Sequence, residues 1–131
     1  MSLYLAIFDD RVEVDGWVLG HYSDFACFRE AVARCFTVDQ LPLLLGHSDS
    51  DGEWSTSDLP YLRDELRVVA KRFRQLPPEP LVGAFEHTAQ LRANARCLAD
   101  CFHNADGENL LDALLSLVDQ ADSLGLPILF Q

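Results

Sequence analysis

The chain begins with an apolar run that predicts a β-strand. Residues 4–8 are aliphatic or aromatic, and such side chains are enriched in strands. The dipeptide Asp15-Gly16 is a turn signal, and apolar residues flank it at 12–14 and 17–19. These two runs could pair with each other as a hairpin, or the second could pair with the first strand.

The next segment has the periodicity of a helix. Phe25, Phe28, Val32 and Phe36 recur at steps of three and four residues, which predicts a helix over residues 24–36 with one buried face. Ser23 is the expected N-cap. The neighbouring acid at position 24 would then lie in the first turn, where the helix dipole favours negative charge.

Two short apolar segments are expected to complete the sheet. Residues 41–45 form a continuous apolar run, which suits a strand buried on both faces. Residues 126–131 form a second run, and Pro127 is tolerated there at the start of a strand or at a sheet edge.

Two longer segments predict further helices. From Ser57, the expected N-cap, to about residue 74, an apolar stripe indicates a buried face, and Pro60 falls in the first turn, where no N–H is needed. Residues 106–124 carry a second stripe that ends at Gly125, a natural stop. Residues 84–91 suit a short helix, and residues 97–102 suit a helical turn or a strand.

We therefore expect an α+β or α/β fold, with a single domain over residues 1–131 and a small mixed sheet of about four strands covered by three to four helices.

The composition narrows the classes of function. The chain carries 21 acidic and 10 basic residues, a formal net charge of −11. A nucleic-acid backbone needs Lys and Arg to replace its counterions, so we expect no direct nucleic-acid partner. No apolar run is long enough for a membrane span, and the first residues lack the positive region of a signal peptide. We expect a cytoplasmic protein whose four cysteines are reduced.

The loop from His47 to Asp58 is the main candidate for chemistry. A calcium-loop template would use His47, Asp49, Asp51, Gly52, Glu53 and Asp58, but His and Asp occupy the end positions that require Asp and Glu. A calcium-dependent binding module using residues 47–58 therefore stays an alternative. A small hydrolase using His47 and the nearby acids is a weaker one, because no nucleophile motif surrounds the serines. We favour a non-enzymatic protein with no cofactor and no metal.

Charge distribution points to a basic partner. No Lys or Arg follows Arg96, and Glu108, Asp112, Asp119 and Asp122 fall on one helical face without interleaved bases. The negative electrostatic field of these acids favours fast and selective binding of a basic protein. Trp54 is the expected aromatic anchor of that interface. The expected partner-binding residues are Asp49, Asp51, Glu53, Trp54, Asp106, Glu108, Asp112 and Asp119.

Six sequence segments together resemble bacterial immunity protein family 70, small α+β proteins of polymorphic toxin systems. They are Leu3-Tyr-Leu-Ala-Ile-Phe-Asp9, Tyr22-Ser-Asp-Phe25, His47-Ser-Asp-Ser-Asp-Gly-Glu-Trp-Ser55, Phe73-Arg-Gln-Leu-Pro-Pro78, Asp106-Gly-Glu108 and Gly125-Leu-Pro-Ile-Leu-Phe-Gln131. The resemblance covers nearly the whole chain and implies an antidote that binds and blocks a cognate toxin without catalysing a reaction. The charge adds the hypothesis that this toxin is a basic nuclease domain.

Overall fold

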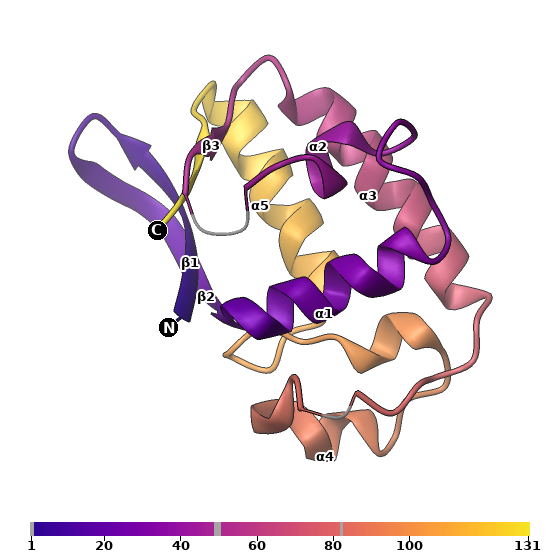
Figure 1. Cartoon of the computed structure of the whole chain (residues 1–131). Coiled ribbons are helices and arrows are strands. Elements are labelled where there is room, and N and C mark those ends of the chain that lie inside the picture. The colour runs from indigo at the N-terminus through magenta and orange to yellow at the C-terminus, as the bar shows by residue number, and fades with distance from the viewer. Residues whose placement is uncertain (1, 49–50, 82) are drawn as a thin grey trace.

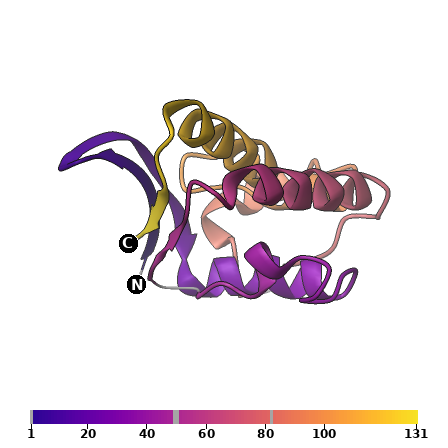
Figure 2. The same ribbon diagram turned by 90° about the horizontal axis from the view of Figure 1, so that it is seen from above.

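The computed structural model describes residues 2–48, 51–81 and 83–131, and it confirms an α+β fold (Figure 1). The strands are β1 (Ser2–Asp9), β2 (Val12–His21), β3 (Glu53–Trp54) and β4 (Ile128–Phe130). The helices are α1 (Tyr22–Ala33), α2 (Pro42–Leu45), α3 (Leu59–Arg74), α4 (Ala89–Arg92) and α5 (Leu110–Leu124), with 3-10 turns η1 (Glu86–Thr88) and η2 (Leu98–Cys101). Seen from above, the β1–β2 hairpin curves away on one side and the long helices lie on the other (Figure 2).

The four strands form one sheet in the order β2-β1-β4-β3, and every neighbouring pair is antiparallel. The predicted strand number is therefore correct, but the prediction of a mixed sheet is wrong for the described residues. The C-terminal strand β4 lies in the interior of the sheet, between β1 and β3. Backbone hydrogen bonds of 2.8 Å in both directions between Tyr4 and Gln131 extend its pairing with β1 by one residue.

The first hairpin turns earlier than the Asp15-Gly16 signal suggested. The chain reverses after β1, where Asp10 takes a left-handed conformation with φ 57°, and Asp15-Gly16 lies inside β2. Trp17 pairs with Leu5, which confirms the alternative in which the second run joins strand one. Gly16 leaves room for the Tyr4 ring, because a Cβ there would lie 2.7 Å from the Tyr4 hydroxyl and the ring would have to shift.

Helix α1 begins two residues before the predicted start. Its N-cap is His21 rather than Ser23, and the His21 N–H donates to the Asp24 carboxylate at 2.7 Å. The predicted stripe is confirmed by the complete burial of Phe25 and Phe28. Phe36 lies beyond the helix end at Ala33.

The apolar run at 41–45 is helical, which corrects the prediction of a strand. Pro42 opens the short helix α2, and its N-terminal N–H groups at Leu43 and Leu44 donate to the carboxylate of Glu65 at 3.2 and 3.0 Å. A carboxylate is favourable at this end of a helix, and this one comes from α3. The fourth strand of the sheet is instead the two-residue strand β3, which lies at its edge.

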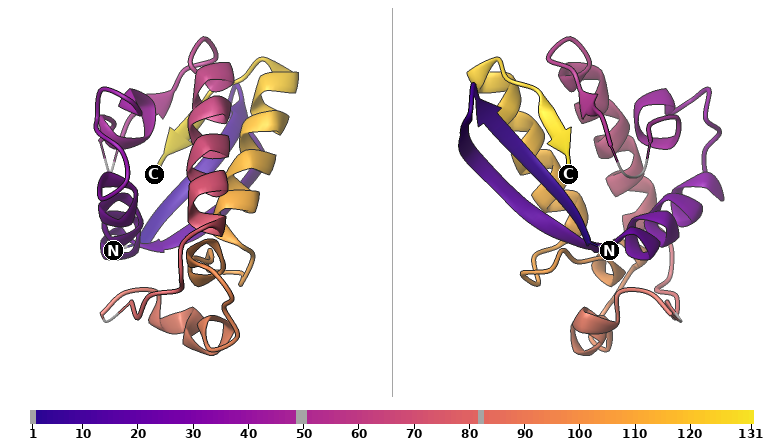
Figure 3. Two further views of the ribbon diagram at one scale, coloured as in Figure 1. Left: turned by 90° about the vertical axis from the view of Figure 1, so that its right-hand side faces the viewer. Right: turned by 60° about the vertical axis from the view of Figure 1, so that its left-hand side comes forward.

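Helices α3 and α5 lie side by side, with α2 on the other flank of α3 (Figure 3). The predicted buried face of α3 is confirmed, since its five apolar residues are all fully buried: Leu59, Leu62, Leu66, Val69 and Phe73. The N-cap of α3 is Asp58 rather than Ser57. Helix α5 starts at Leu110, later than predicted, because the side chain of Asn109 accepts the Asp112 N–H at 3.1 Å.

The segment between α3 and α5 closes the end of the core nearest α1. The predicted helix at 84–91 is present as η1 followed by α4, and 97–102 forms the 3-10 turn η2. Phe85 and Phe102 are fully buried and meet edge to face, with ring centroids 5.3 Å apart. No helix among the described residues is long and apolar enough to cross a membrane.

Candidate partner-binding site

Trp54, the expected aromatic anchor, lies in the core. Its side chain is 0% exposed, its indole N–H donates to the Leu43 carbonyl at 2.9 Å, and its ring meets Phe130 edge to face. The neighbouring acids Asp51 and Glu53 are exposed. The assignment of Trp54 to a partner surface is therefore corrected, because β3 pairs with β4 and turns the indole inward. Trp17 is also buried.

His47 holds the acidic loop to the sheet. Its Nδ1 lies 2.7 Å from the Ser48 carbonyl oxygen, and its Nε2 lies 2.9 Å from that of Glu53. The ring also packs on Phe130, with centroids 4.2 Å apart. Both ring nitrogens face backbone oxygens, so neither is presented to a substrate or a metal ion. This geometry assigns His47 a structural role and gives the hydrolase alternative no support.

The described residues give the calcium alternative no support either. Asp49, a required ligand of the calcium template, lies outside the described residues. Asp58 accepts a hydrogen bond from the Ser55 hydroxyl at 2.9 Å and occupies the N-cap position of α3. Within the described ranges, no three His, Cys, Asp or Glu side chains gather closely enough to hold a metal ion.

The two Asp-Gly-Glu loops lie at opposite edges of the sheet. Glu53 belongs to β3, the strand at one edge. The loop at 104–109 borders β2 at the other edge, where the Ala105 N–H donates to the Val18 carbonyl at 3.0 Å. The two loops therefore border different edge strands of the sheet.

The loop at 104–109 is built around a buried asparagine. Asn104 is 0% exposed; its side-chain oxygen accepts the N–H groups of Asp106 and Glu108 at 3.1 and 3.0 Å. Its amide donates to the Glu108 carboxylate at 2.9 Å. Beside this loop, a polar hollow of about 200 Å³ is lined by residues that include Asp15, Asp106 and Glu108. Three carboxylates thus share this edge of the molecule.

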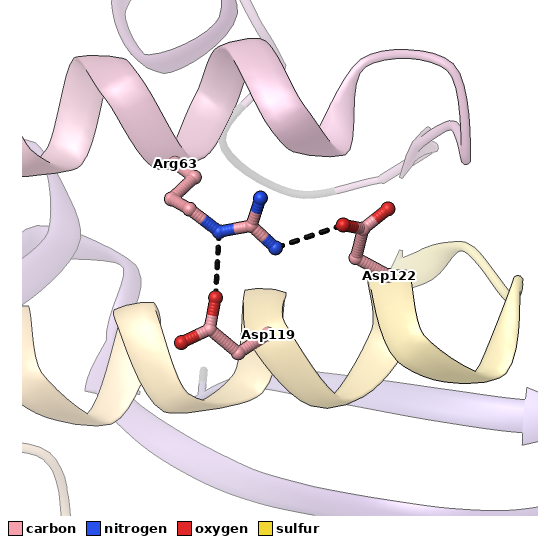
Figure 4. A network of polar contacts seen from close by, with 3 residues as sticks. All are labelled: Arg63, Asp119 and Asp122. Carbon is pink, nitrogen blue, oxygen red and sulfur yellow. Dashed lines mark hydrogen bonds and ion pairs between the residues drawn. The ribbon is translucent and has the colours of Figure 1, made fainter.

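The acidic face of α5 is partly neutralised by α3. Arg63 donates from Nε to Asp119 at 2.6 Å and from a terminal nitrogen to Asp122 at 2.8 Å (Figure 4). These two ion pairs raise the pKa of Arg63. Asp112 lies 3.9 Å from Arg74, and its side chain stays 69% exposed. The bases that the α5 sequence lacks come from the neighbouring helix, so Asp119 is less available to a partner than the sequence suggested.

The cysteines are packing residues. All four are free thiols, and burial is the largest cause that raises the pKa of both Cys27 and Cys101. A raised thiol pKa keeps the sulfur protonated and poorly nucleophilic at neutral pH.

The sequence interpretation missed an apolar surface on the side of α1, α2 and α3. Tyr61, Val38 and Val68 are 68%, 51% and 47% exposed and lie there beside hollows in the surface. A signal for two of them was available, since Tyr61 and Val68 fall off the buried stripe of α3. Apolar side chains on the outer face of an amphipathic helix indicate a contact surface when they cluster.

A comparison with known proteins bears on the whole chain. A family model described as immunity protein 70 matches residues 3–130. No curated protein and no solved structure matches the chain. The family match spans both edges of the sheet, the acidic loops and every described helix, and it confirms the resemblance found in the sequence. The chain belongs to the immunity protein 70 family.

Proposed function

We propose that this protein is a non-enzymatic antidote that binds a cognate toxin protein and blocks it through an acidic surface. The observation that carries the proposal is the match of the immunity protein 70 family to residues 3–130. The local chemistry is consistent with binding. The His47 ring contacts backbone oxygens, and the Trp54 ring is buried in the core. The thiols are buried or half-buried.

The charge of the molecule suggests the class of toxin. With a formal net charge of −11, the protein attracts basic surfaces over several ångströms and repels nucleic acid. A toxin that binds nucleic acid, such as a nuclease, has a basic cleft that an acidic protein can occupy in place of its substrate. We therefore propose a basic nuclease domain as the partner.

The acidic residues divide into two groups that can be tested separately. Asp51 and Glu53 are exposed at the β3 edge of the sheet. Asp106, Glu108 and Asp112 lie toward the β2 edge and the start of α5. We propose that the β3-edge acids contact the toxin directly, and that the second group acts at longer range by steering association. Asp119 belongs to neither group because Arg63 engages it.

The first experiment measures protection and binding together. The toxin probe is a candidate toxin domain encoded by a reading frame adjacent to this gene, produced with and without this protein in a bacterial host. Co-production should restore growth, and the purified pair should form a complex whose dissociation constant rises with salt. Normal killing by the toxin domain in the presence of this protein, with no complex in solution, would reject the proposal for that toxin.

Charge variants then separate contact from steering. Asp51→Asn with Glu53→Gln removes two charges at the β3 edge, and Asp106→Asn with Asp112→Asn removes two at the other. Both pairs should slow association, whereas only the first should also speed dissociation, because direct contacts act on the dissociation rate. Equal dissociation rates for the two pairs would place the contact elsewhere. The toxin class is tested by measuring nuclease activity of the toxin domain alone and with an excess of this protein. We expect activity in the first case and its loss in the second.

A further inference from the structure

An open groove lies on the side of the molecule formed by α1, residues 36–45 and α3. It consists of three adjoining hollows of about 510, 240 and 380 Å³. The first and second share Phe36, and the second and third share Gln40 and Glu65. We call it the α1–α3 groove.

The groove is lined mainly by apolar side chains, and each hollow carries one that is strongly exposed. Val38 lines the first hollow at 51% exposure, Val68 the second at 47%, and Tyr61 the third at 68%. A concave surface patch with exposed apolar side chains is typical of a surface that binds another protein. Tyr is also among the residues that carry most of the energy at such interfaces.

The charges around the groove specify the chemistry of its occupant. The acidic lining residues at the surface are Glu30, Asp58 and Asp64, and the basic lining residue is Arg29. Glu65 also lines the groove, but its buried carboxylate already accepts the N–H groups of α2. The guanidinium of Arg29 already donates to the Leu45 carbonyl. A complementary segment would carry apolar side chains with Lys or Arg beside them.

The groove has a polarity along α3. The helix carries three bases in its last turn: Lys71, Arg72 and Arg74. Asp58 and Asp64 lie toward its start, where the base Arg63 is paired with two acids of α5. The third hollow, with Tyr61 and Asp58, lies at this acidic end. It is also lined by Leu43, whose carbonyl accepts the indole N–H of Trp54, the neighbour of Glu53 in β3. Leu43 therefore links the third hollow to the buried indole next to Glu53.

We infer that the α1–α3 groove is the docking site for the toxin, which inserts an apolar segment whose basic residues face the end at Tyr61 and Asp58. This inference rests on the proposed function and adds to it the position of the interface and the character of the segment that enters. The apolar contacts with Tyr61 and Val68 hold the complex, and the acids orient the segment. The loop at 104–109, at the far edge of the sheet, does not take part in the contact.

The test compares exposed apolar residues inside and outside the groove. The probe is the same toxin domain, and the variants are Tyr61→Ala and Val68→Ala. Matched controls are Leu91→Ala and Leu124→Ala, which remove side chains that are 45% and 49% exposed outside the groove. The dissociation constant should rise about 10-fold or more for Tyr61→Ala, by less for Val68→Ala, and about 2-fold at most for the controls. Circular dichroism and melting temperatures verify that all four variants fold.

The outcomes separate the inference from the proposed function. If the wild-type protein neither binds nor neutralises the toxin domain, the proposed function fails and the inference fails with it. If the wild-type protein binds and the groove variants behave as the controls do, only the groove inference is overturned.

A second copy of the chain is the competing occupant. Sedimentation of the wild-type protein should show a monomer at micromolar concentration. A dimer that Tyr61→Ala dissociates, with toxin binding unchanged, would assign the groove to self-association and overturn the inference.

Discussion

The carboxylate of Asp24 accepts the backbone N–H of Phe85 at 2.6 Å and so joins two segments that are 61 residues apart. Its second oxygen accepts the N–H of His21 at the start of α1. Asp24 is 2% exposed, and Gly20 provides the space for it, since a Cβ there would lie 2.4 Å from the carboxylate. One buried side chain thus caps a helix and fixes the segment that leads to η1.

Replacing Asp24 should therefore destabilise the fold strongly. Asp24→Ala leaves a buried N–H without an acceptor and removes a helix cap, which together should cost about 3 kcal/mol. Urea unfolding followed by circular dichroism measures this cost. The control is Ser23→Ala, the neighbouring exposed residue, which should stay within about 0.5 kcal/mol. If the two substitutions lowered the free energy of unfolding equally, Asp24 would not be the residue that caps the helix.

The sequence predicts the long helices well because their information is local. The stripe from Leu59 to Phe73 repeats over four turns, so its buried face follows from spacing alone. The stop at Gly125, with φ 68°, is equally local. The same reasoning located most helices to within a few residues.

Elements decided by distant residues were predicted poorly. Residues 41–45 are too short for periodicity to distinguish strand from helix, and Glu65 on α3 supplies the carboxylate that caps them as a helix. The candidate site shows the same limit. Pairing of β3 with β4 turns Trp54 inward, and Arg63 on α3 forms ion pairs with acids of α5. Both contacts join segments that are far apart in the sequence, so residue spacing within one segment cannot predict them.

The burial of Trp54 gives a prediction on stability. Trp54→Ala removes a fully buried ring and should cost about 3–5 kcal/mol, whereas Trp54→Phe should cost less because an aromatic ring remains in the core. Tyr61→Ala, on an exposed ring, should change the free energy of unfolding by less than about 0.5 kcal/mol. Urea unfolding of the three variants measures the difference. A small loss for Trp54→Ala would show that β3 does not hold this indole in the core.

Glu65 should make stability depend on pH in an unusual direction for an acid. Burial raises the pKa of its carboxyl above 4.5, against the opposing effect of the hydrogen bonds from Leu44 and Leu43. The folded protein therefore holds this proton more tightly than the unfolded chain. The contribution of Glu65 to stability is fully present below pH 4.5 and is lost as the pH rises through the folded pKa.

The measurement is a comparison of the wild-type protein with Glu65→Gln between pH 4.5 and 7.5. The wild type should gain stability relative to the variant as the pH falls. Asp64→Asn, on the exposed side of the same helical turn, controls for the loss of one charge. A difference between wild type and Glu65→Gln that stays constant over this range would contradict the prediction.

His103 should act in the opposite direction. Burial is the main cause that lowers its pKa below 6.5; the charges of Arg92 and His87 add to this effect, and that of Asp100 opposes it. Its Nδ1 is buried and has no hydrogen-bond partner among the described residues. Protonation therefore places an unpaired charge in the core. The contribution of His103 is present above pH 6.5 and is lost as the pH falls from there through the folded pKa.

His103→Gln should abolish this loss, because an uncharged side chain cannot take up the proton. The unfolding free energy of the wild type should fall more than that of the variant between pH 7.5 and pH 5. Glu65 is present in both proteins, so its opposite contribution cancels in the comparison. Titration of the His103 ring by NMR gives an independent reading, with an expected midpoint below pH 6.5 in the folded protein. A midpoint at or above that value, or parallel pH profiles for the two proteins, would show that the ring is solvated or paired in solution.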